Sequence, residues 1–127
     1  MTTAAPPYRD PGLSTSTRVS DLVARMTLDE KIAQLSAVWA FEVVGQDGPD
    51  PERLRALAGN GIGQITRLAG STNLRAPEVA RAANVIQRFL VEETRLGIPA
   101  IYHEESLHGL LSRDAPVFQQ SIGAAAA

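Results

Sequence analysis

The sequence predicts an α/β fold built around one parallel strand–helix–strand unit. Residues 62–68 form a short apolar run with β-branched members, which is typical of a buried strand. Residues 78–96 carry apolar side chains at helical spacing up to Gly97, and residues 98–102 form a second extended apolar run. Two such strands joined by a helix are parallel, with a right-handed crossover, so their carboxyl ends meet at one edge of the sheet.

The N-terminal part of the chain predicts an arm followed by two short helices. Residues 1–17 show no apolar period and contain many small and turn-forming residues, so we expect a flexible N-terminal arm. Residues 18–26 have apolar side chains at helical spacing. Thr27 and Glu30 then form the pattern of a capping box, which predicts a second helix whose apolar face extends to Val38.

The middle of the chain predicts a loop and two further helices. Residues 45–50 are expected to form a loop, and Pro51 is expected to open a helix that ends at residues 59–61, which contain two glycines. Pro77 opens the longest helix of the chain. The last residues, 117–127, predict another passage from a strand into a helix.

Composition and charge exclude several classes of partner. The 127 residues include 12 basic and 14 acidic side chains, with a formal net charge of -2 and no cysteine. Scattered charges of nearly balanced sign favour neither nucleic acid nor an anionic membrane. No apolar run approaches the roughly 20 residues of a membrane span. No signal peptide is visible, so we expect a cytoplasmic chain, while export of the complete protein stays open.

An ionisable cluster, His103, Glu104, Glu105 and His108, follows the second predicted strand. A zincin-type metal site needs two histidines four residues apart on a helix, whereas His103 and His108 are five residues apart. Glu104 and Glu105 are disfavoured as a catalytic pair because adjacent residues of an extended chain point to opposite faces. We therefore expect one glutamate to accept hydrogen bonds from a hydroxyl-bearing ligand, without a metal or cofactor. The alternative is an ion pair of either glutamate with a neighbouring arginine.

Two further residues are candidates for the same site. Arg67 ends the first predicted strand, which places it on the same rim as Glu105, and its alternative role is an exposed salt bridge. His108 precedes Gly109 at a strand-end turn, where a histidine more often fixes a loop through backbone carbonyls than contacts a ligand. Glu105, His108 and Arg67 are thus the candidate substrate-binding residues, and no catalytic residue is assigned.

Four stretches of the chain together resemble a known family. Residues 18–35, 61–65, 97–109 and 115–125 follow the order and spacing of the N-terminal barrel domain of family 3 glycoside hydrolases, the β-glucosidases and β-xylosidases. The resemblance implies an α/β fold, the incomplete N-terminal portion of a (β/α)8 TIM-like barrel preceded by short helices, over residues 18–127. A complete barrel of this kind needs about 250 residues.

The resemblance also implies what the chain contributes and what it lacks. In this family the acidic residue three positions before the His-Gly pair binds sugar hydroxyls, and that residue is Glu105 here. The family retains anomeric configuration through an aspartate nucleophile and an acid/base residue, and neither position exists in this chain. We therefore expect a fragment of a retaining β-glycosidase that acts on terminal non-reducing β-D-glucosyl or β-D-xylosyl residues, inactive by itself.

The expected partners follow from the same resemblance. They are a β-linked oligosaccharide or aryl glycoside, together with the remainder of the barrel and the following domain. Trp39 and Phe41 are candidates for a stacking wall beside a sugar ring, although aromatics after an apolar helix are more often core. The alternative function is a non-catalytic sugar-binding or assembly module that completes a barrel with another chain.

Overall fold

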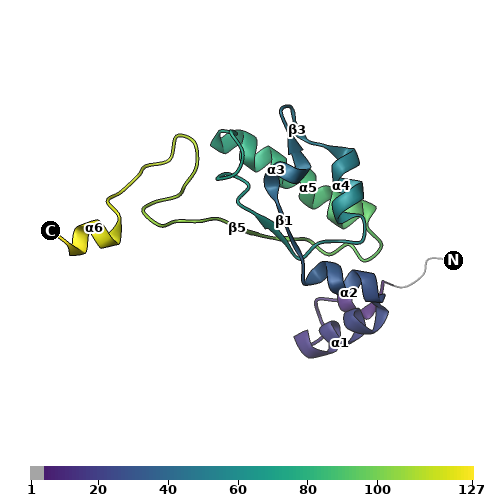
Figure 1. The fold of residues 1–127 in the computed structure, drawn as a ribbon. Coiled ribbons are helices and arrows are strands. Elements are labelled where there is room, and N and C mark those ends of the chain that lie inside the picture. The colour runs from purple at the N-terminus through teal and green to yellow at the C-terminus, as the bar shows by residue number, and fades with distance from the viewer. Residues whose placement is uncertain (1–4) are drawn as a thin grey trace.

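A three-stranded parallel sheet lies at the centre of the computed structural model, which describes residues 5–127 (Figure 1). Its strands are β1 (Ala37–Trp39), β4 (Gln64–Thr66) and β5 (Ile101–His103), in the order β1-β4-β5. Val38 pairs with Ile65 in parallel register. The predicted α/β fold with parallel strands is therefore confirmed, as a mixed α/β fold with a small sheet.

Helices and one hairpin make up the other regular elements of the described chain. The helices are η1 (Pro7–Arg9), α1 (Thr15–Arg25), α2 (Leu28–Gln34), α3 (Ala40–Val43), α4 (Pro51–Ala58), α5 (Ala76–Glu93) and α6 (Ser121–Ala125). The antiparallel strands β2 (Val44–Gly45) and β3 (Gly48–Pro49) form the hairpin. The loop predicted at residues 45–50 therefore contains β3 and the last residue of β2, and only residues 46 and 47 form the turn between them. Gly48 follows this turn with a φ of 116°, which glycine adopts readily.

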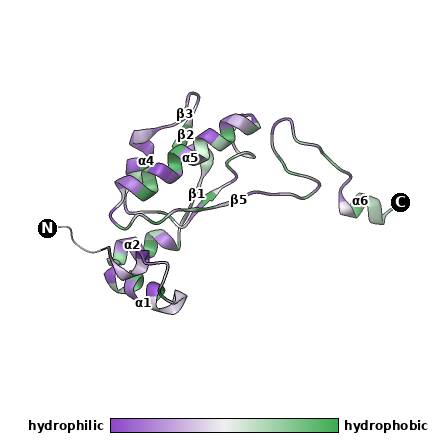
Figure 2. Ribbon diagram, turned by 180° about the vertical axis from the view of Figure 1, so that it is seen from behind, coloured by the Kyte–Doolittle hydropathy of each residue, from purple (hydrophilic) through white to green (hydrophobic). Residues whose placement is uncertain are grey.

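One face of the parallel sheet packs against α5. Ile65, Ile86 and Leu90 are each 0 % exposed in this core. Figure 2 shows hydrophobic and hydrophilic positions alternating along α5, as expected for a helix that covers a sheet with one face. The Tyr102 hydroxyl reaches the same layer and donates to the Ala83 carbonyl at 3.1 Å. Burial raises the pKa of Tyr102, so its hydroxyl remains protonated as a donor.

The opposite face of the sheet has little cover within residues 5–127. Ala37, Gln64 and Ile101 are neighbours in register, one on each strand, and all three are exposed. Ile101 leaves 67 % of its surface in solvent. Because side chains alternate along a strand, these residues share the face away from Ile65.

The two N-terminal helices meet at Thr27, as the sequence predicts. The Glu30 amide donates to Thr27 Oγ1 at 3.2 Å, and the Thr27 amide donates to Glu30 Oε2 at 2.8 Å. This reciprocal pair is the expected capping box. Glu30 is only 7 % exposed and forms an ion pair with Arg95, so α2 is joined to the segment that follows α5.

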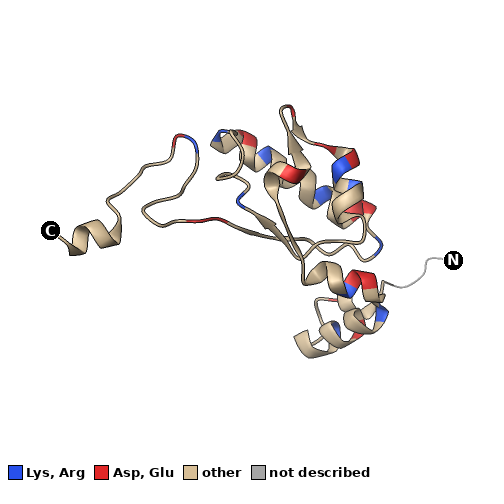
Figure 3. Cartoon of the chain, viewed as in Figure 1, with Lys and Arg blue, Asp and Glu red and all other residues tan. Residues whose placement is uncertain are grey.

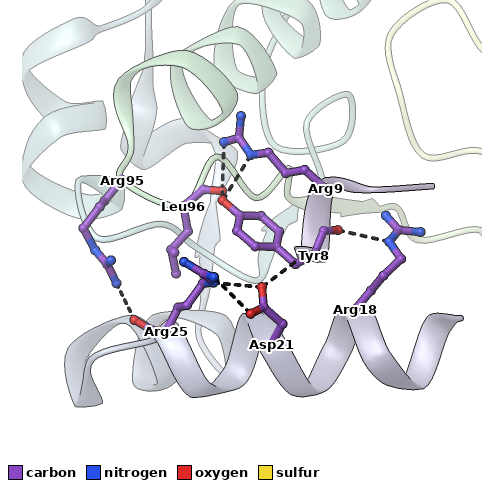
Figure 4. A network of polar contacts seen from close by, with 7 residues as sticks. All are labelled: Tyr8, Arg9, Arg18, Asp21, Arg25, Arg95 and Leu96. Atoms are coloured by element: carbon purple, nitrogen blue, oxygen red, sulfur yellow. Dashed lines mark hydrogen bonds and ion pairs between the residues drawn. The ribbon is translucent and has the colours of Figure 1, made fainter. Parts of the chain in front are cut away.

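The described part of the predicted flexible arm is held against the rest of the chain (Figure 4). The Tyr8 hydroxyl donates to the Leu96 carbonyl at 2.8 Å, and Arg9 donates to the same oxygen at 3.2 Å. The Tyr8 amide donates to the Asp21 carboxylate at 3.1 Å. A flexible arm therefore does not describe residues 5–17, because Tyr8 finds partners distant in sequence; residues 1–4 lie outside the described part.

Two predicted elements differ in the structure. Val38 belongs to β1 and not to the second helix, because pairing with β4 buries it against the core. No strand is assigned to residues 115–120 before α6, where Val117 and Phe118 are 68 % and 64 % exposed. Figure 1 shows α6 lying away from the sheet. The segment before α6 has no neighbouring strand in the described chain, and its Phe118 amide donates instead to the His108 carbonyl at 2.6 Å.

Charged side chains of both signs are interspersed over the helices of the described chain (Figure 3). Several form exposed ion pairs, such as Arg55 with Glu93 at 3.5 Å. None of the helices in residues 5–127 combines the length and the hydrophobicity required to cross a bilayer.

Candidate functional site

The carboxyl ends of the three parallel strands meet at one edge of the sheet. Trp39, Thr66 and His103 are the last residues of β1, β4 and β5, and they are partners in register. In parallel sheets, ligands bind in the space outside these carboxyl ends. The cluster predicted from sequence begins at this edge.

Strands β4 and β5 are tied together at this edge by two hydrogen bonds that involve His103. The Thr66 hydroxyl lies 2.9 Å from His103 Nε2, and the Arg67 amide donates to the His103 carbonyl at 2.8 Å. The position of His103 is therefore set by both its side chain and its backbone.

Glu104 turns toward the loop that joins β4 to α5. Its Oε1 accepts from the Ala69 amide at 2.6 Å, and its Oε2 accepts from the Gly70 amide at 3.1 Å. The side chain is half-buried. The alternative of an ion pair with arginine does not hold for Glu104, because backbone amides bind both of its oxygens.

Glu105 projects from the next position of the same chain and is exposed. Its carbonyl accepts from the Leu111 amide at 3.2 Å. Within residues 5–127, no hydrogen bond or ion pair engages its carboxylate. Since successive side chains of an extended segment point to opposite sides, we expect Glu105 to lie opposite Glu104 and on the side of His103. Its four lone-pair positions are free to accept hydrogen bonds.

Arg67 lies at the same edge with an unusual backbone. It has a φ of 56°, a left-handed conformation that is uncommon outside glycine, and such residues cluster at functional sites. Its guanidinium carbon lies 5.7 Å from the ring centroid of Trp39. Its Nε is buried and has no hydrogen-bond partner in the described chain. The exposed salt bridge considered for Arg67 is absent from residues 5–127.

His108 is half-buried in the segment beyond β5. Its carbonyl accepts from the Phe118 amide at 2.6 Å, next to Gly109 with a φ of 106°. Its Nδ1 is buried without a partner in the described chain. The backbone of His108 therefore holds the loop, whereas its ring has an unused polar atom.

Trp39 and Phe41 form an exposed aromatic pair beside Arg67. Their ring centroids are 5.9 Å apart, and the two residues are 42 % and 52 % exposed. The alternative in which both residues belong to the core is therefore wrong for this chain. Phe41 and Arg113 line a groove of about 620 Å³, and Arg67 and Arg113 line a second groove of about 450 Å³.

Sequence reasoning missed the contact between Glu104 and the two amides. Its signal is the Ala69-Gly70 pair shortly after a strand end, where successive backbone amides form an anion-binding turn. The partners lie 35 residues apart in the chain, so only the parallel register brings them together. No group of three or more His, Asp or Glu side chains in residues 5–127 is placed to hold a metal ion.

The geometry supports binding more than catalysis by these residues. Glycoside hydrolysis uses a general acid and a second carboxylate on opposite sides of the bond that is cleaved. Glu104 is directed to backbone amides, so Glu104 and Glu105 do not form such a pair. A single free carboxylate at a strand end is suited to accept hydrogen bonds from ligand hydroxyls.

Comparison with known proteins identifies the family. The family model described as "Glycosyl hydrolase family 3 N terminal domain" matches residues 27–127. A "Probable beta-glucosidase C" from Aspergillus flavus is 35% identical over 139 residues, covering 97% of this chain and 21% of the relative. The protein of the same name from Aspergillus oryzae is 34% identical with the same coverage.

A "Putative beta-xylosidase" from Formosa agariphila is 27% identical over 121 residues, covering 94% of this chain and 16% of the relative. The chain thus spans about a fifth of the length of the first two relatives, at 21% of each. The matched region includes the parallel sheet and the ionisable cluster beyond β5. The chain therefore belongs to glycosyl hydrolase family 3, within the N-terminal domain of that family.

Proposed function

We propose that this chain contributes a sugar-binding carboxylate, Glu105, to a retaining β-glycosidase that removes terminal non-reducing β-D-glucosyl or β-D-xylosyl residues. The observation that carries the proposal is the exposed Glu105 carboxylate at the carboxyl edge of a parallel sheet, which has no partner within residues 5–127. The names of the relatives, β-glucosidase and β-xylosidase, support this class of substrate. A β-linked oligosaccharide or an aryl glycoside would be the ligand.

A carboxylate suits a sugar because it accepts hydrogen bonds from two neighbouring hydroxyls at once. Hydrogen bonds to a charged acceptor contribute about 1.5–3 kcal/mol each, more than bonds between neutral groups. Glu105 makes no competing bond within the described chain, so a sugar hydroxyl displaces only water from it.

Arg67 and His108 are proposed as further substrate-binding residues. Each carries a buried nitrogen, Arg67 Nε and His108 Nδ1, that has no partner in the described chain. An unsatisfied buried polar atom has an energetic cost, so a turn of either side chain that brought this nitrogen to a ligand hydroxyl would be favourable. Trp39 and Phe41 lie beside Arg67 with exposed rings, to which the apolar face of a sugar would stack.

The catalytic pair is proposed to come from outside this chain. A retaining mechanism places a nucleophile and an acid/base residue about 5 to 5.5 Å apart. Glu104 is bound to the Ala69 and Gly70 amides and cannot serve as the partner of Glu105. We therefore expect residues 1–127 alone to be inactive, with the nucleophile and the acid/base supplied by the remainder of the barrel and the following domain.

The uncovered sheet face supports completion of a barrel by further strands. Ala37, Gln64 and Ile101 are exposed on this face, and β1 and β5 each have one unpaired edge within residues 5–127. Side chains on this face would fill the interior of a closed barrel. The same observation supports the alternative of a non-catalytic module that completes a barrel with another chain.

The experiment uses a chimaera in which this chain replaces the matching 21% of the Aspergillus oryzae relative. We expect hydrolysis of 4-nitrophenyl β-D-glucoside or β-D-xyloside by the chimaera and none by the 127-residue chain. Glu105→Ala should lower kcat/KM about a hundredfold, since two charge-assisted hydrogen bonds are lost. Glu92→Ala, which removes an exposed carboxylate on α5, is the matched control and should change nothing.

Other outcomes would contradict the proposal. Equal kcat/KM for the Glu105→Ala chimaera and its parent would remove Glu105 from the sugar site. Turnover by the 127-residue chain alone would show that the catalytic pair lies within it. If the chain and a separately produced remainder of the relative became active only on mixing, the assembly module would be favoured.

A further inference from the structure

We infer that Glu104 is a positioning residue, whose carboxylate, bound by the Ala69 and Gly70 amides, fixes the direction in which Glu105 projects. The inference rests on the proposed function of Glu105 as a sugar ligand. It concerns a residue that does not itself touch the sugar, because both of its oxygens are occupied by the loop between β4 and α5.

The two hydrogen bonds of Glu104 are well suited to holding a backbone. One is 2.6 Å and the other 3.1 Å long, and each uses a different oxygen, so the carboxylate cannot rotate without breaking one of them. Bonds from backbone amides to an ionised carboxylate are stronger than neutral ones. The donors, Ala69 and Gly70, are buried and half-buried, which protects the bonds from competing water.

The residues on either side of Glu104 are restrained as well. His103 is held by the Thr66 hydroxyl at 2.9 Å and by the Arg67 amide at 2.8 Å. The Glu105 carbonyl accepts from the Leu111 amide at 3.2 Å. The backbone from His103 to Glu105 is therefore fixed at three consecutive residues, while the Glu105 side chain is left for the ligand.

Gly70 allows the loop between β4 and α5 to pack closely against the restrained segment. A Cβ atom at Gly70 would lie 2.7 Å from the Leu111 carbonyl oxygen and 3.0 Å from Arg67 Nε. The absence of a side chain thus lets the loop approach both the Leu111 segment, which bonds Glu105, and Arg67. The loop, Glu104 and the Leu111 segment together form one packed support around Glu105.

A double-mutant cycle in the active chimaera tests whether Glu104 acts through Glu105. Glu104→Gln keeps the shape but replaces one acceptor oxygen by a donor group, so kcat/KM should fall about tenfold through misplacement of Glu105. In the Glu105→Ala background, Glu104→Gln should cause no further loss, because the group that it positions is gone. Equal losses in both backgrounds would show a general structural role and overturn the inference.

Two variants provide the controls. Glu104→Asp keeps the charge but is shorter, so it should retain part of the activity and fall between the parent and Glu104→Gln. Asp50→Asn alters a carboxylate that also accepts from two backbone amides, those of Glu52 at 2.9 Å and Arg53 at 3.3 Å, and should leave kcat/KM unchanged. An equal effect of Asp50→Asn would also overturn the inference.

An NMR measurement on the 127-residue chain separates failure of the inference from failure of the proposed function. Glu104→Gln should shift the Ala69 and Gly70 amide resonances and accelerate their hydrogen exchange, whatever the fate of the sugar. Unchanged amides would remove the physical basis of the inference. If Glu104→Gln changes the two amides as expected but Glu105→Ala leaves kcat/KM of the chimaera unchanged, the inference about Glu104 stands and the proposed function of Glu105 is wrong.

Discussion

The two ends of the parallel sheet use carboxylates in opposite ways. Near the amino ends of the strands, Glu30 is 7 % exposed and is bound by Arg95 and by the Thr27 amide. At the carboxyl ends, Glu105 is exposed, and its carboxylate has no partner in the described chain. The first arrangement joins distant segments, and the second leaves a strong acceptor for a ligand.

The pKa of Glu30 is lowered by the groups that bind its carboxylate. The hydrogen bond from Arg95, with smaller support from the Thr27 amide, lowers the pKa of Glu30 to about 2. Part of that effect is opposed by burial, which alone would raise the pKa. A carboxylate held by hydrogen bonds and an ion pair stabilises the folded chain. Such a role is expected at the amino ends of parallel strands, since in barrels of this kind the active site lies at the carboxyl ends.

The largest effect is expected for Glu105, at the carboxyl ends of the strands, where a substitution should change activity and not stability. Glu105→Ala should reduce kcat/KM of the chimaera about a hundredfold while changing the free energy of unfolding by less than about 0.5 kcal/mol. Urea unfolding of the 127-residue chain and its variant measures the second quantity. A large loss of stability would show that Glu105 is structural, and the comparison between the two ends would fail.

For Glu30, near the amino ends of the strands, a substitution should lower the stability of the chain. Glu30→Ala should lower the free energy of unfolding by about 2 kcal/mol, because the capping box and the ion pair with Arg95 are both lost. Urea unfolding measures this change. The control is Glu93→Ala, whose ion pair with Arg55 is more than half exposed on both sides and should contribute less than about 0.5 kcal/mol.

Acid should act on the same carboxylate. The folded pKa of Glu30, about 2, lies below its ordinary value of 4.5, so its contribution is complete above pH 4.5 and is lost as the pH falls toward 2. The wild-type chain should therefore lose more stability than Glu30→Gln over this range. Unfolding curves at several pH values compare the two, and parallel pH profiles would contradict the role of Glu30.

A smaller effect is expected at Arg67, where one substitution should raise the stability and lower the activity. Arg67→Gly should raise the free energy of unfolding by about 0.5 kcal/mol, because glycine adopts a φ of 56° more readily. The same change should lower kcat/KM of the chimaera about tenfold through loss of the guanidinium. The control for activity is Arg88→Lys, which keeps the charge of an exposed arginine on α5 and should leave kcat/KM unchanged.

Local signals in the sequence were sufficient for several elements. The capping box at Thr27 predicted the start of α2, because the two residues that form it are three positions apart. Pro51 and Pro77 lie within the first turn of α4 and α5, where a missing amide is tolerated. The alternation of side chains predicted that at most one of Glu104 and Glu105 faces a ligand.

Contacts between distant segments decided the remaining features. Val38 pairs with β4 in place of extending α2, and Tyr8 reaches Leu96, 88 residues away. The pattern of apolar residues around Val38 suits a helix or a strand equally, so only the neighbouring strand selects between them.

The candidate site divides in the same way. The sequence by itself determined that a glutamate follows a buried parallel strand, and the order of its motifs indicated the family. Only the tertiary structure decided that Glu104 is bound by the Ala69 and Gly70 amides, and that no side chain or amide of residues 5–127 engages the Glu105 carboxylate. The physical reason is that capping and periodicity act between near neighbours, whereas the partners of a carboxylate depend on which strand ends the fold places side by side.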